Sequence, residues 1–343
     1  MHAVRSDSFA GVERYLTYVA PELARRGHDV LVIGGDPERM ARDLDGAGVA
    51  HVDAATVADV ARQLVRAPAG DVLHTHMTAA ELAAWAVWPV RRGPTVTTMH
   101  FAAPRGGSGA KARAFGLLAP RFARQIAISE FVADAVGGGL VVIPNGVPDR
   151  RPHGDDGPRE HVVLAAQRLE PEKDPTTALR GWASSGLAGD GWRLDVAGAG
   201  RLEPQLRALA TELGIAASVS FVGRVDDLDV RMARAGIFLA TAPREPFGLS
   251  VTEAMSFGCP IVAADGGGHR ELLRGTDPRQ LVAPGSPEAL GERLRLLADD
   301  VGLRDRLGRA NRARYLAEYT LDAHVDRLEG VYGAVTTRGG ARR

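Results

Sequence analysis

Residues 236–264 have the sequence GIFLATAPREPFGLSVTEAMSFGCPIVAA, in which two apolar runs flank a polar loop and a helical segment. The runs, at 236–240 and 260–264, are short and aliphatic, which is typical of strands buried on both faces of a parallel sheet. Between them we expect a loop at 243–248 and a helix from about Ser250 to Phe257. The stretch therefore predicts one repeat of an open α/β sheet.

The same alternation of apolar runs and helical patterns fills both halves of the chain. We expect strands at 28–34, 71–75, 95–100, 125–128 and 140–143 in the first half, and at 161–166, 193–197 and 219–222 in the second. We expect further helices at 11–26, 288–297 and 303–319. This alternation predicts parallel βαβ units, and thus an α/β chain of two doubly wound, Rossmann-like domains.

The domain boundary is expected near residue 150. Residues 149–160, DRRPHGDDGPRE, are dense in proline, glycine and charge and have no apolar period, which is typical of a linker. The chain of 343 residues also exceeds the size at which one core stops growing. We therefore predict domains at 1–148 and 149–335 that face a cleft, followed by a disordered polar tail at 336–343.

Composition excludes several classes of protein. The chain has 42 basic and 42 acidic residues, so it lacks the net field that gathers nucleic acid or an anionic membrane. Its single cysteine, Cys259, excludes an internal disulfide and fits a reducing cytosol. No run approaches the roughly 20 apolar residues of a membrane span, and the N-terminus has no signal-peptide pattern. These features predict a cytoplasmic protein that does not bind nucleic acid.

The loop and helix at 245–253, EPFGLSVTE, carry the most specific chemical pattern. A helix N-terminus offers free N–H groups, and Gly248 lets a ligand approach the backbone. An anion such as a diphosphate can therefore bind there. Glu245 lies in the loop and Glu253 one turn into the helix, where carboxylates accept hydrogen bonds from hydroxyl groups. The alternative is two surface glutamates around a helix start, which the Gly-Gly-Gly run at 266–268 makes less attractive.

The sequence EPFGLSVTEAMSFGCPIVA resembles the E-x7-E signature of retaining glycosyltransferases of family 4, the glycosyl transferases group 1, and further motifs of that family occur from Gly11 to Glu271. The resemblance implies a GT-B fold and transfer of a sugar from a nucleotide diphosphate sugar. It implies that Glu245 contacts the donor sugar and that Glu253 contacts the ribose hydroxyls. The residues between them that it places at the donor are Phe247, Gly248, Leu249 and Ser250.

A second pattern, QRLEPEKD at 167–174, follows an expected strand. Arg168 and Lys173 therefore leave the carboxyl end of a parallel strand, where open α/β sheets bind ligands. Lys173 is one of only two lysines in the chain, and such charges stabilise a departing diphosphate. The segment resembles the family motif G-R-L-x-x-x-K-N, with Gln167 and Asp174 in place of glycine and asparagine. A solvated charge cluster is the alternative.

Two further segments resemble the nucleobase site of the family. VAGAGRLEP at 196–204 follows a strand and opens a helix, but its glycine pattern is incomplete as a dinucleotide fingerprint. The second segment is FVGRVDDLD at 221–229. The donor-binding residues that the resemblance implies in the two segments are Gly198, Gly200, Arg224 and Val225. Either stretch alone is equally typical of an ordinary strand-turn-helix.

In the N-terminal half, SFAGVER resembles the glycine loop of the family and TTMHF resembles its T-x-H segment. The resemblance implies that Gly11 lies near the donor phosphates and that His100 lies beside the transferred sugar, where an imidazole hydrogen-bonds the sugar or orients the acceptor. For His74 and His76, also in family-like segments, packing roles are at least as typical. Only residues 1–6 precede the glycine loop, so either the first strand is short or the true start lies upstream.

The expected mechanism is transfer with stabilisation of the leaving group. Arg168, Lys173 and the helix N-terminus take up negative charge as the bond between the anomeric carbon and phosphate breaks. The oxocarbenium-like sugar is held by Glu245 and His100. Attack of the acceptor from the same face of the sugar, with retention, rests on the resemblance alone.

We expect no metal and no cofactor, with the nucleotide sugar as donor substrate. Two Asp-x-Asp pairs, at 43–45 and 227–229, are of the type that holds a divalent metal, but neither lies near the diphosphate residues in the sequence. The acceptor is a small molecule, a glycan or a lipid-linked sugar. The donor base and sugar stay open.

Three other classes share parts of these patterns. A glycoside hydrolase uses paired carboxylates but does not need Arg168 and Lys173 beside them. An NAD-dependent dehydrogenase needs a complete glycine fingerprint. A sugar-nucleotide-binding protein peripheral to the inner membrane face is favoured by the basic amphipathic segment Lys111–Arg124, for which an ordinary surface helix is the alternative.

Overall fold

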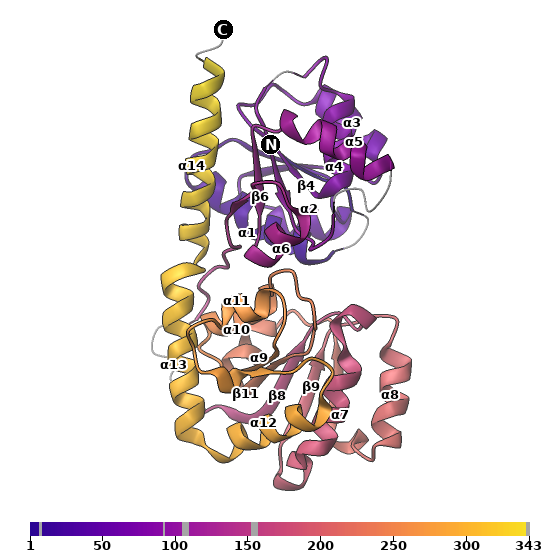
Figure 1. Cartoon of the computed structure of the whole chain (residues 1–343), viewed down its shortest axis with the longest axis vertical. Coiled ribbons are helices and arrows are strands. Elements are labelled where there is room, and N and C mark those ends of the chain that lie inside the picture. The colour runs from indigo at the N-terminus through magenta and orange to yellow at the C-terminus, as the bar shows by residue number, and fades with distance from the viewer. Residues whose placement is uncertain (7–8, 92, 105–109, 152–156, 341–343) are drawn as a thin grey trace. The chain divides into compact units, whose positions relative to one another are not determined.

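The computed structural model describes residues 1–6, 9–91, 93–104, 110–151 and 157–340. The chain divides into two compact units, Met1–Gly146 with Leu321–Arg343, and Val147–Thr320. Each unit contains a parallel sheet with helices around it (Figure 1). The predicted pair of doubly wound, Rossmann-like domains is therefore confirmed. The first unit ends at Gly146 instead of residue 148.

The N-terminal unit has a seven-stranded sheet in the order β3-β2-β1-β4-β5-β6-β7. Its strands are β1 (His2–Val4), β2 (Val30–Ile33), β3 (Val49–Val52), β4 (Leu73–His76), β5 (Thr95–Met99), β6 (Arg124–Ala127) and β7 (Val141–Val142). Its helices are α1 (Gly11–Arg25), α2 (Pro37–Leu44), α3 (Val57–Arg66), α4 (Met77–Ala86), α5 (Ala110–Leu118), α6 (Glu130–Val136) and α14 (Leu321–Gly340). The chain builds outward from β1 on one side and from β4 on the other, so the topological switch point lies between these two strands.

The C-terminal unit has a six-stranded parallel sheet in the order β10-β9-β8-β11-β12-β13. Its strands are β8 (Glu160–Ala166), β9 (Arg193–Ala197), β10 (Val219–Gly223), β11 (Ala235–Ala240), β12 (Ile261–Ala264) and β13 (Leu281–Val282). Its helices are α7 (Pro175–Ser185), α8 (Glu203–Glu212), α9 (Leu228–Arg234), α10 (Leu249–Ser256), α11 (Gly268–Leu272), α12 (Pro287–Asp299) and α13 (Val301–Glu318). Here the switch point lies between β8 and β11.

The core of the C-terminal unit depends on close packing of α7 against α12. Gly181 on α7 faces Leu290 on α12, and a Cβ at Gly181 would lie 2.4 Å from a Leu290 methyl carbon. Leu290 and the neighbouring Trp182 are buried. Because only glycine permits this approach, the two helices cover one face of the sheet without a gap, and its strand ends are held in fixed positions.

Helix α14 (Leu321–Gly340) departs from the sequence-based prediction in two ways. It belongs to the N-terminal unit and not to the domain predicted at 149–335. Its last turns also occupy residues 336–340, where we expected a disordered tail. The domain assignment was wrong, and so was the prediction of disorder for 336–340, because both relied on local composition; residues 341–343 lie outside the described ones.

Contacts with α1 explain the position of α14 (Figure 1). Val325 and Leu328 on α14 are fully buried. Arg26, just after α1, donates to the carboxylates of Asp326 and Glu329 at 2.5 and 2.8 Å. The partner of this helix therefore lies near the other end of the chain, where composition around residue 336 gives no sign of it.

Two strands, β3 and β13, were not expected from the sequence, whereas the short first strand, one of the two alternatives that we considered, is present as β1. Strand β1 has only three residues, His2–Val4, all buried, and it lies in the middle of the N-terminal sheet. Strands β3 (Val49–Val52) and β13 (Leu281–Val282) form sheet edges, and β3 has no fully buried residue. Short or half-exposed strands lack the continuous apolar run that marks the others.

Two sequence-based predictions fall partly outside the described residues. In the predicted linker 149–160, residues 152–156 lie outside them, and β8 begins at Glu160. In the segment Lys111–Arg124, α5 ends at Leu118 and a 3-10 turn follows, Ala119–Arg121. The side chain of Lys111 is among those not described. Among the helices of the described ranges, none has the length and apolar character of a membrane span.

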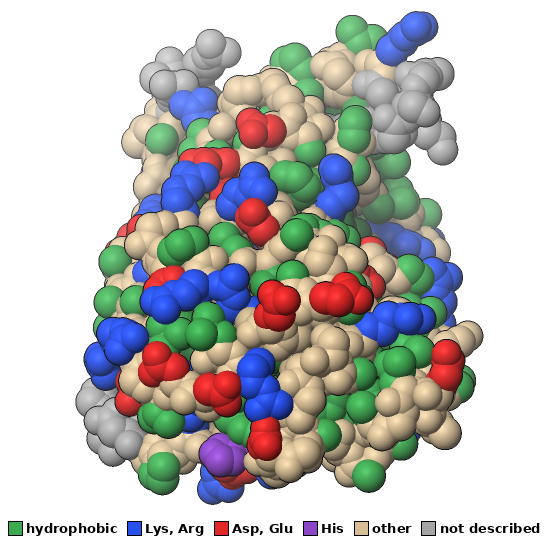
Figure 2. All heavy atoms as spheres, turned by 60° about the horizontal axis from the view of Figure 1, so that its bottom comes forward, with side chains coloured by type: hydrophobic (Ala, Val, Ile, Leu, Met, Phe, Trp, Pro, Cys, Tyr) green, Lys and Arg blue, Asp and Glu red, His purple; other side chains and the backbone are tan. Residues whose placement is uncertain are grey.

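The charged side chains on the surface reflect the equal numbers of basic and acidic residues in the sequence. Figure 2 shows one face of the molecule, on which basic and acidic side chains are interspersed. Many of the described arginines are ion-paired, such as Arg193 with Glu160 at 2.7 Å and Arg207 with Glu203 at 2.8 Å. Exposed pairs of this kind contribute little to stability.

Candidate functional site

A connected group of polar residues in the C-terminal unit lies at its switch point, where β8 and β11 end. Lys173, after β8, and Glu245, after β11, form an ion pair with 2.5 Å between Nζ and Oε2. The Thr241 hydroxyl donates to the Lys173 carbonyl at 2.9 Å, and the Gln167 amide donates to Thr241 Oγ1 at 3.1 Å. The two loops are therefore joined by side chains, and the expected meeting of the two motifs at one sheet edge is what the fold produces.

The backbone around Lys173 fixes its position. Lys173 ends a 3-10 turn, Pro171–Lys173, and Asp174 follows with a left-handed φ of 47°. Aspartate and asparagine tolerate this conformation better than most residues because their short side chains hydrogen-bond locally. Asp174 also accepts a hydrogen bond from the Thr177 N–H at 3.2 Å and so caps α7. The departure from the asparagine of the family motif thus keeps the geometry.

Glu245 is ionised despite its burial. Burial favours the neutral acid, but the charge and hydrogen bond of Lys173, together with electrostatic interactions with His269 and Arg168, outweigh it and hold the pKa of Glu245 below its usual value. The side chains of Glu245 and Lys173 keep exposed fractions of only 14% and 19%. A partly buried carboxylate and ammonium in contact can each serve a ligand that carries hydroxyl and phosphate groups.

Helix α10 begins directly beside this pair. Gly248 precedes the helix with φ of 107°, a conformation that favours glycine, and Leu249 and Ser250 form the first turn. The N–H groups of a first turn have no partners within the helix and suit an anion. Glu253, one turn further, is buried. Phe247 is buried too, so the loop from Glu245 to the helix is rigidly packed.

His269 belongs to this site, and we did not identify it from the sequence. Its side chain is 2% exposed, and its Nδ1 has no hydrogen-bond partner among the described residues. Burial lowers the pKa of His269, while Glu245 opposes that effect. An orphaned buried nitrogen beside Glu245 is a feature that a bound ligand would satisfy. The signal in the sequence was its place directly after the glycine run at 266–268.

The glycine run holds the loop before α10 by backbone contact. A Cβ at Gly266 would lie 2.1 Å from the Pro243 carbonyl oxygen, and one at Gly268 would lie 2.3 Å from the Phe247 carbonyl oxygen. The Gly268 N–H donates to the Glu245 carbonyl at 2.7 Å. These contacts explain why larger residues would displace Glu245 from the site.

Arg168 lies at the rim of the site. Its guanidinium is 48% exposed and pairs with Glu172 at 2.6 Å. The charge of Arg168 still acts on Glu245, although Lys173 is the residue in contact with that carboxylate. A ligand that reaches Arg168 therefore has only an exposed ion pair to displace.

The glycines after β9 have a packing role. A Cβ at Gly198 would lie 2.0 Å from the Gln167 carbonyl oxygen, and one at Gly200 would lie 2.3 Å from the Leu169 carbonyl oxygen. Gly198 also donates its N–H to the Gly223 carbonyl at 2.7 Å, next to the exposed Arg224. Donor-binding roles for Gly198, Gly200, Arg224 and Val225 stay predictions.

The N-terminal unit presents two of the expected residues. Gly11 is the first residue of α1, and His100 directly follows β5. His100 is buried, and its Nε2 lies 3.0 Å from Nδ1 of His76. Burial lowers the pKa of His100 to about 3, so the imidazole is neutral at physiological pH. The roles of Gly11 and His100 toward a donor stay predictions.

Comparisons with known proteins decide the family. The model described as Glycosyl transferases group 1 matches residues 149–314, and that described as Glycosyltransferase Family 4 matches residues 9–151. A phosphatidyl-myo-inositol mannosyltransferase of Mycobacterium leprae is 31% identical over 287 residues, which cover 78% of this chain and 75% of the relative. The chain belongs to the group 1 glycosyltransferases. The hydrolase and dehydrogenase alternatives are thereby set aside.

Further relatives of this group 1 glycosyltransferase agree along the chain. A phosphatidyl-myo-inositol mannosyltransferase of Mycobacterium tuberculosis is 27% identical and aligns with 96% of this chain and 94% of its own. The crystal structure of Anabaena Alr3699/HepE in complex with UDP-glucose superposes with a TM-score of 0.82 at 22% identity, covering 97% of this chain and 100% of that one. The sucrose-phosphate synthase of Thermosynechococcus elongatus gives a TM-score of 0.76 at 17% identity, with 98% and 99% covered. These likenesses show the GT-B fold.

Proposed function

We propose that this glycosyltransferase is a retaining, metal-independent hexosyltransferase that uses a nucleoside diphosphate sugar. The observation that carries the proposal is the Lys173–Glu245 ion pair beside the first turn of α10. It offers an ammonium and free N–H groups for the diphosphate and a carboxylate for sugar hydroxyls. Relatives support a nucleotide-sugar donor, because one solved structure of the same fold contains UDP-glucose.

The transfer step uses these groups as follows. The bond between the anomeric carbon and the diphosphate oxygen breaks, and its electron pair stays on that oxygen. Lys173, Arg168 and the N-terminus of α10 stabilise the added negative charge. The acceptor oxygen bonds to the anomeric carbon from the same face, and its proton passes to the departing diphosphate. Glu245 and the neutral His100 hold the hydroxyls of the sugar.

Glu253 is proposed to bind the ribose of the donor. It lies one turn into α10, on the same helix whose N-terminus faces the diphosphate. In ribonucleoside diphosphate sugars a ribose follows the diphosphate, so a carboxylate one turn from the proposed phosphate site is available to the ribose diol. Phe247, Gly248, Leu249 and Ser250, which lie between Glu245 and Glu253 in the sequence, are proposed to contribute to donor binding.

The proposal includes no metal ion. Three of the four aspartates in the two Asp-x-Asp pairs are engaged with arginines: Asp43 with Arg42 at 3.0 Å, Asp227 with Arg231 at 3.0 Å and Asp229 with Arg150 at 3.0 Å. The charge that a metal would bring to the diphosphate is supplied by Arg168, Lys173 and the helix. The acceptor is proposed to be the hydroxyl of a glycan or of a lipid-linked sugar, met at the cytoplasmic face of the membrane.

A panel of nucleotide sugars tests the proposal. The purified protein is mixed with each compound, and thermal stabilisation and slow hydrolysis are measured; the matching donor is expected to raise Tm through ligand binding. The anomeric configuration of the first product formed is then read by NMR and should equal that of the donor. Inversion, or the absence of stabilisation by every nucleotide sugar, would overturn the proposal.

A further inference from the structure

The N-terminal unit contains a group of buried histidines that the proposed transfer does not use. His2 lies on β1, and His74 and His76 lie on β4. These central strands are paired in parallel register, with His2 opposite His74 and Val4 opposite His76. Since alternate residues of a strand share one face, the register places all three imidazoles on the same side of the sheet.

The three rings are in contact with one another. His2 Nδ1 lies 3.0 Å from His76 Nε2, and the rings of His74 and His76 stack with 4.4 Å between their centroids. One ring nitrogen from each of the three lies within 4.8 Å of the other two. All three side chains are almost completely buried. An ion bound tetrahedrally to three imidazoles at about 2.0–2.1 Å sets their nitrogens roughly 3.3 Å apart, so small movements of these rings bring all three nitrogens to one ion.

We infer that His2, His74 and His76 bind one late first-row divalent metal ion, of the Zn²⁺ class. Imidazole nitrogens prefer such ions over magnesium or calcium, which take oxygen ligands. The site is separate from the donor residues of the C-terminal unit and does not rest on the proposed function.

The surrounding groups can fix the ring orientations that the ion requires. His76 Nδ1 lies 3.0 Å from His100 Nε2, so an N–H on Nδ1 can donate to His100 and leave Nε2 of His76 free to bind the ion. His74 has two hydroxyl partners, Tyr332 at 2.6 Å and Thr98 at 2.7 Å. One of them is replaced by the ion, and the other accepts the remaining N–H of His74.

In the absence of an ion, the short contact between two of the rings requires a shared proton. His2 Nδ1 and His76 Nε2 are 3.0 Å apart, so one nitrogen carries a hydrogen and the other accepts it. Binding of an ion moves that hydrogen of His2 to its Nε2. The hydrogen bond between His2 and His76 is thus exchanged for bonds from the same two nitrogens to the ion, which is how a buried site exists with and without its metal.

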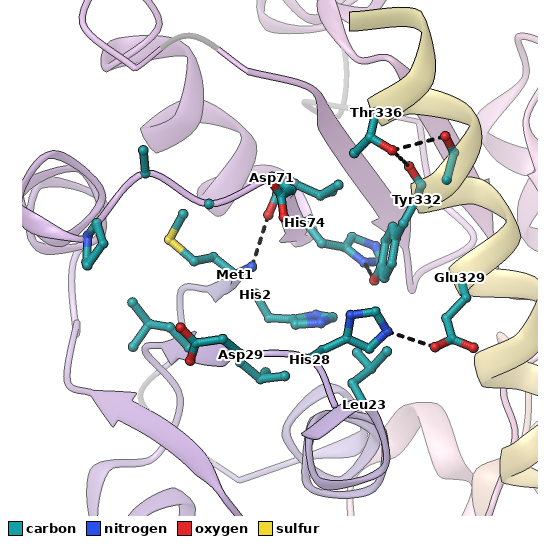
Figure 3. A pocket seen from close by; sticks show the side chains of 17 residues that line it. Met1, His2, Leu23, His28, Asp29, Asp71, His74, Glu329, Tyr332 and Thr336 are labelled. Atoms are coloured by element: carbon teal, nitrogen blue, oxygen red, sulfur yellow. Dashed lines mark hydrogen bonds and ion pairs between the residues drawn. The ribbon is translucent and has the colours of Figure 1, made fainter. Parts of the chain in front are cut away.

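A cavity gives access to the site. It has a volume of about 560 Å³ and is lined in part by His2, His74 and Tyr332. Figure 3 shows His2 and His74 beside this cavity, with Tyr332 reaching His74 from α14. Asp29 and Glu329 also line it, and their carboxylates favour the entry of a cation. The cavity also leaves room for a water or a small ligand as a fourth ligand, as three-histidine zinc sites require.

Binding of Zn²⁺ to the whole chain tests the inference. Protein without a histidine tag is stripped with a chelator and titrated with Zn²⁺ by calorimetry, and the bound metal is counted by elemental analysis. We expect one ion per chain and a rise in Tm. His74→Asn and His76→Asn should each weaken binding by about 100-fold or more, since each removes a direct ligand.

Two other histidines provide matched controls. His28 lines the same cavity and pairs with Glu329, but it is not one of the three ligands, and His161 lies in the C-terminal unit. His28→Asn and His161→Asn should bind Zn²⁺ like the natural chain. Loss of binding in His28→Asn with unchanged binding in His74→Asn would overturn the inference in favour of a site at the cavity rim.

A measurement on the unaltered protein covers the case in which a variant does not fold. X-ray absorption at the zinc edge counts imidazole ligands directly, and cobalt substituted for zinc gives visible bands typical of a tetrahedral ion. Three imidazoles support the site. Fewer imidazoles, sulfur ligands or no binding at stoichiometric Zn²⁺ would overturn it.

Discussion

The two units of this protein have the same kind of sheet and the same kind of switch point, but different chemistry beside it. In the C-terminal unit, the ends of β8 and β11 carry an ion pair, Lys173 with Glu245, in which both groups stay charged. In the N-terminal unit, β1, β4 and the end of β5 carry imidazoles whose pKa values burial lowers. Topology therefore determines where side chains gather, and the pairing available to each group determines whether it is charged.

The difference follows from the free energy of burying charge. A partly buried ammonium next to a carboxylate recovers part of its lost hydration through their attraction, so Lys173 and Glu245 lie in contact as an ion pair. Buried histidines next to one another repel when charged, and they become neutral instead. One unit is thus suited to stabilise a departing anion, and the other to donate neutral hydrogen bonds or to bind a metal ion.

The largest expected effect comes from removing the charges of the C-terminal unit. Arg168→Ala and Lys173→Ala should each lower turnover by about 100- to 1,000-fold, because their charges act on the departing diphosphate. Lys173→Ala should also destabilise the fold, since it leaves Glu245 buried without its partner. Arg168 is exposed, so its variant should keep its Tm.

Arg207→Ala is the matched control for the exposed arginine. Arg207 is 54% exposed and pairs with Glu203 on the same helix, much as Arg168 pairs with Glu172. Turnover of Arg207→Ala should equal that of the natural chain. Equal turnover in Arg168→Ala, Lys173→Ala and Arg207→Ala would remove the diphosphate role from both residues.

Acid should destabilise the N-terminal unit through His324. Burial lowers the pKa of His324 to about 4, although the Pro144 carbonyl, 2.7 Å from Nδ1, opposes this effect; Arg327 lowers it further. The folded pKa is below that of the unfolded chain, so this stability is present above pH 6.5 and lost as pH falls toward 4. The loss is about 3 kcal/mol at the lower end.

Hydrogen exchange of the metal-free protein checks this effect in each unit. Between pH 7.5 and 5, protection in β4 and β5 should fall more than protection in β8 and β11, after correction for the intrinsic exchange rate. His324→Asn should flatten the pH dependence, whereas the exposed His161→Asn should not. An unchanged slope in His324→Asn would contradict the assignment.

A smaller effect is expected for the ribose contact. Glu253→Ala should weaken binding of the nucleoside diphosphate by about 10-fold, the usual worth of a hydrogen bond to a charged group. The same loss should appear when the natural chain is given a nucleotide with a 2′- or 3′-deoxyribose. If Glu253 binds the diol, the Glu253→Ala variant should bind the ribose and deoxyribose nucleotides with equal affinity. A variant that still prefers the ribose nucleotide as strongly as the natural chain does would place the contact elsewhere.

The smallest effect is expected from chelation. Transfer at 25 °C in excess EDTA should stay within about twofold of its rate without EDTA, because protein charges replace a metal at the diphosphate. Restoration of a lost activity by magnesium or manganese would overturn metal independence. A change in Tm that only zinc reverses, with unchanged turnover, would instead report the histidine site of the N-terminal unit.

Much of the fold follows from local pattern. The apolar runs at 161–166, 193–197 and 260–264 became β8, β9 and β12 within one residue at each end. Whether a buried strand forms depends mainly on an apolar run of a few adjacent residues, so a short window of sequence is enough to predict it. The edge strands and the three-residue β1 lack that signal.

The part of the candidate site that could be predicted from the sequence is the part that follows from the parallel strand order of the sheet. Arg168, Lys173 and Glu245 follow strands, and parallel strands bring their carboxyl ends to one edge, so the sequence alone placed the two motifs together. It did not give the contact of 2.5 Å between Lys173 and Glu245, because loop conformation sets it. The sequence did not identify His269 as a site residue, because the burial of His269 depends on backbone contacts of the glycine run at 266–268.

The sequence by itself determined the α/β class, the two units, and the charged residues at the strand ends, because all of these depend on periodicity and motif over a few residues. Only the tertiary structure decided that α14 packs on α1 and that His2 lies against His74 and His76. These placements join segments from distant parts of the chain. Strand register and helix docking set them, and no local pattern encodes either.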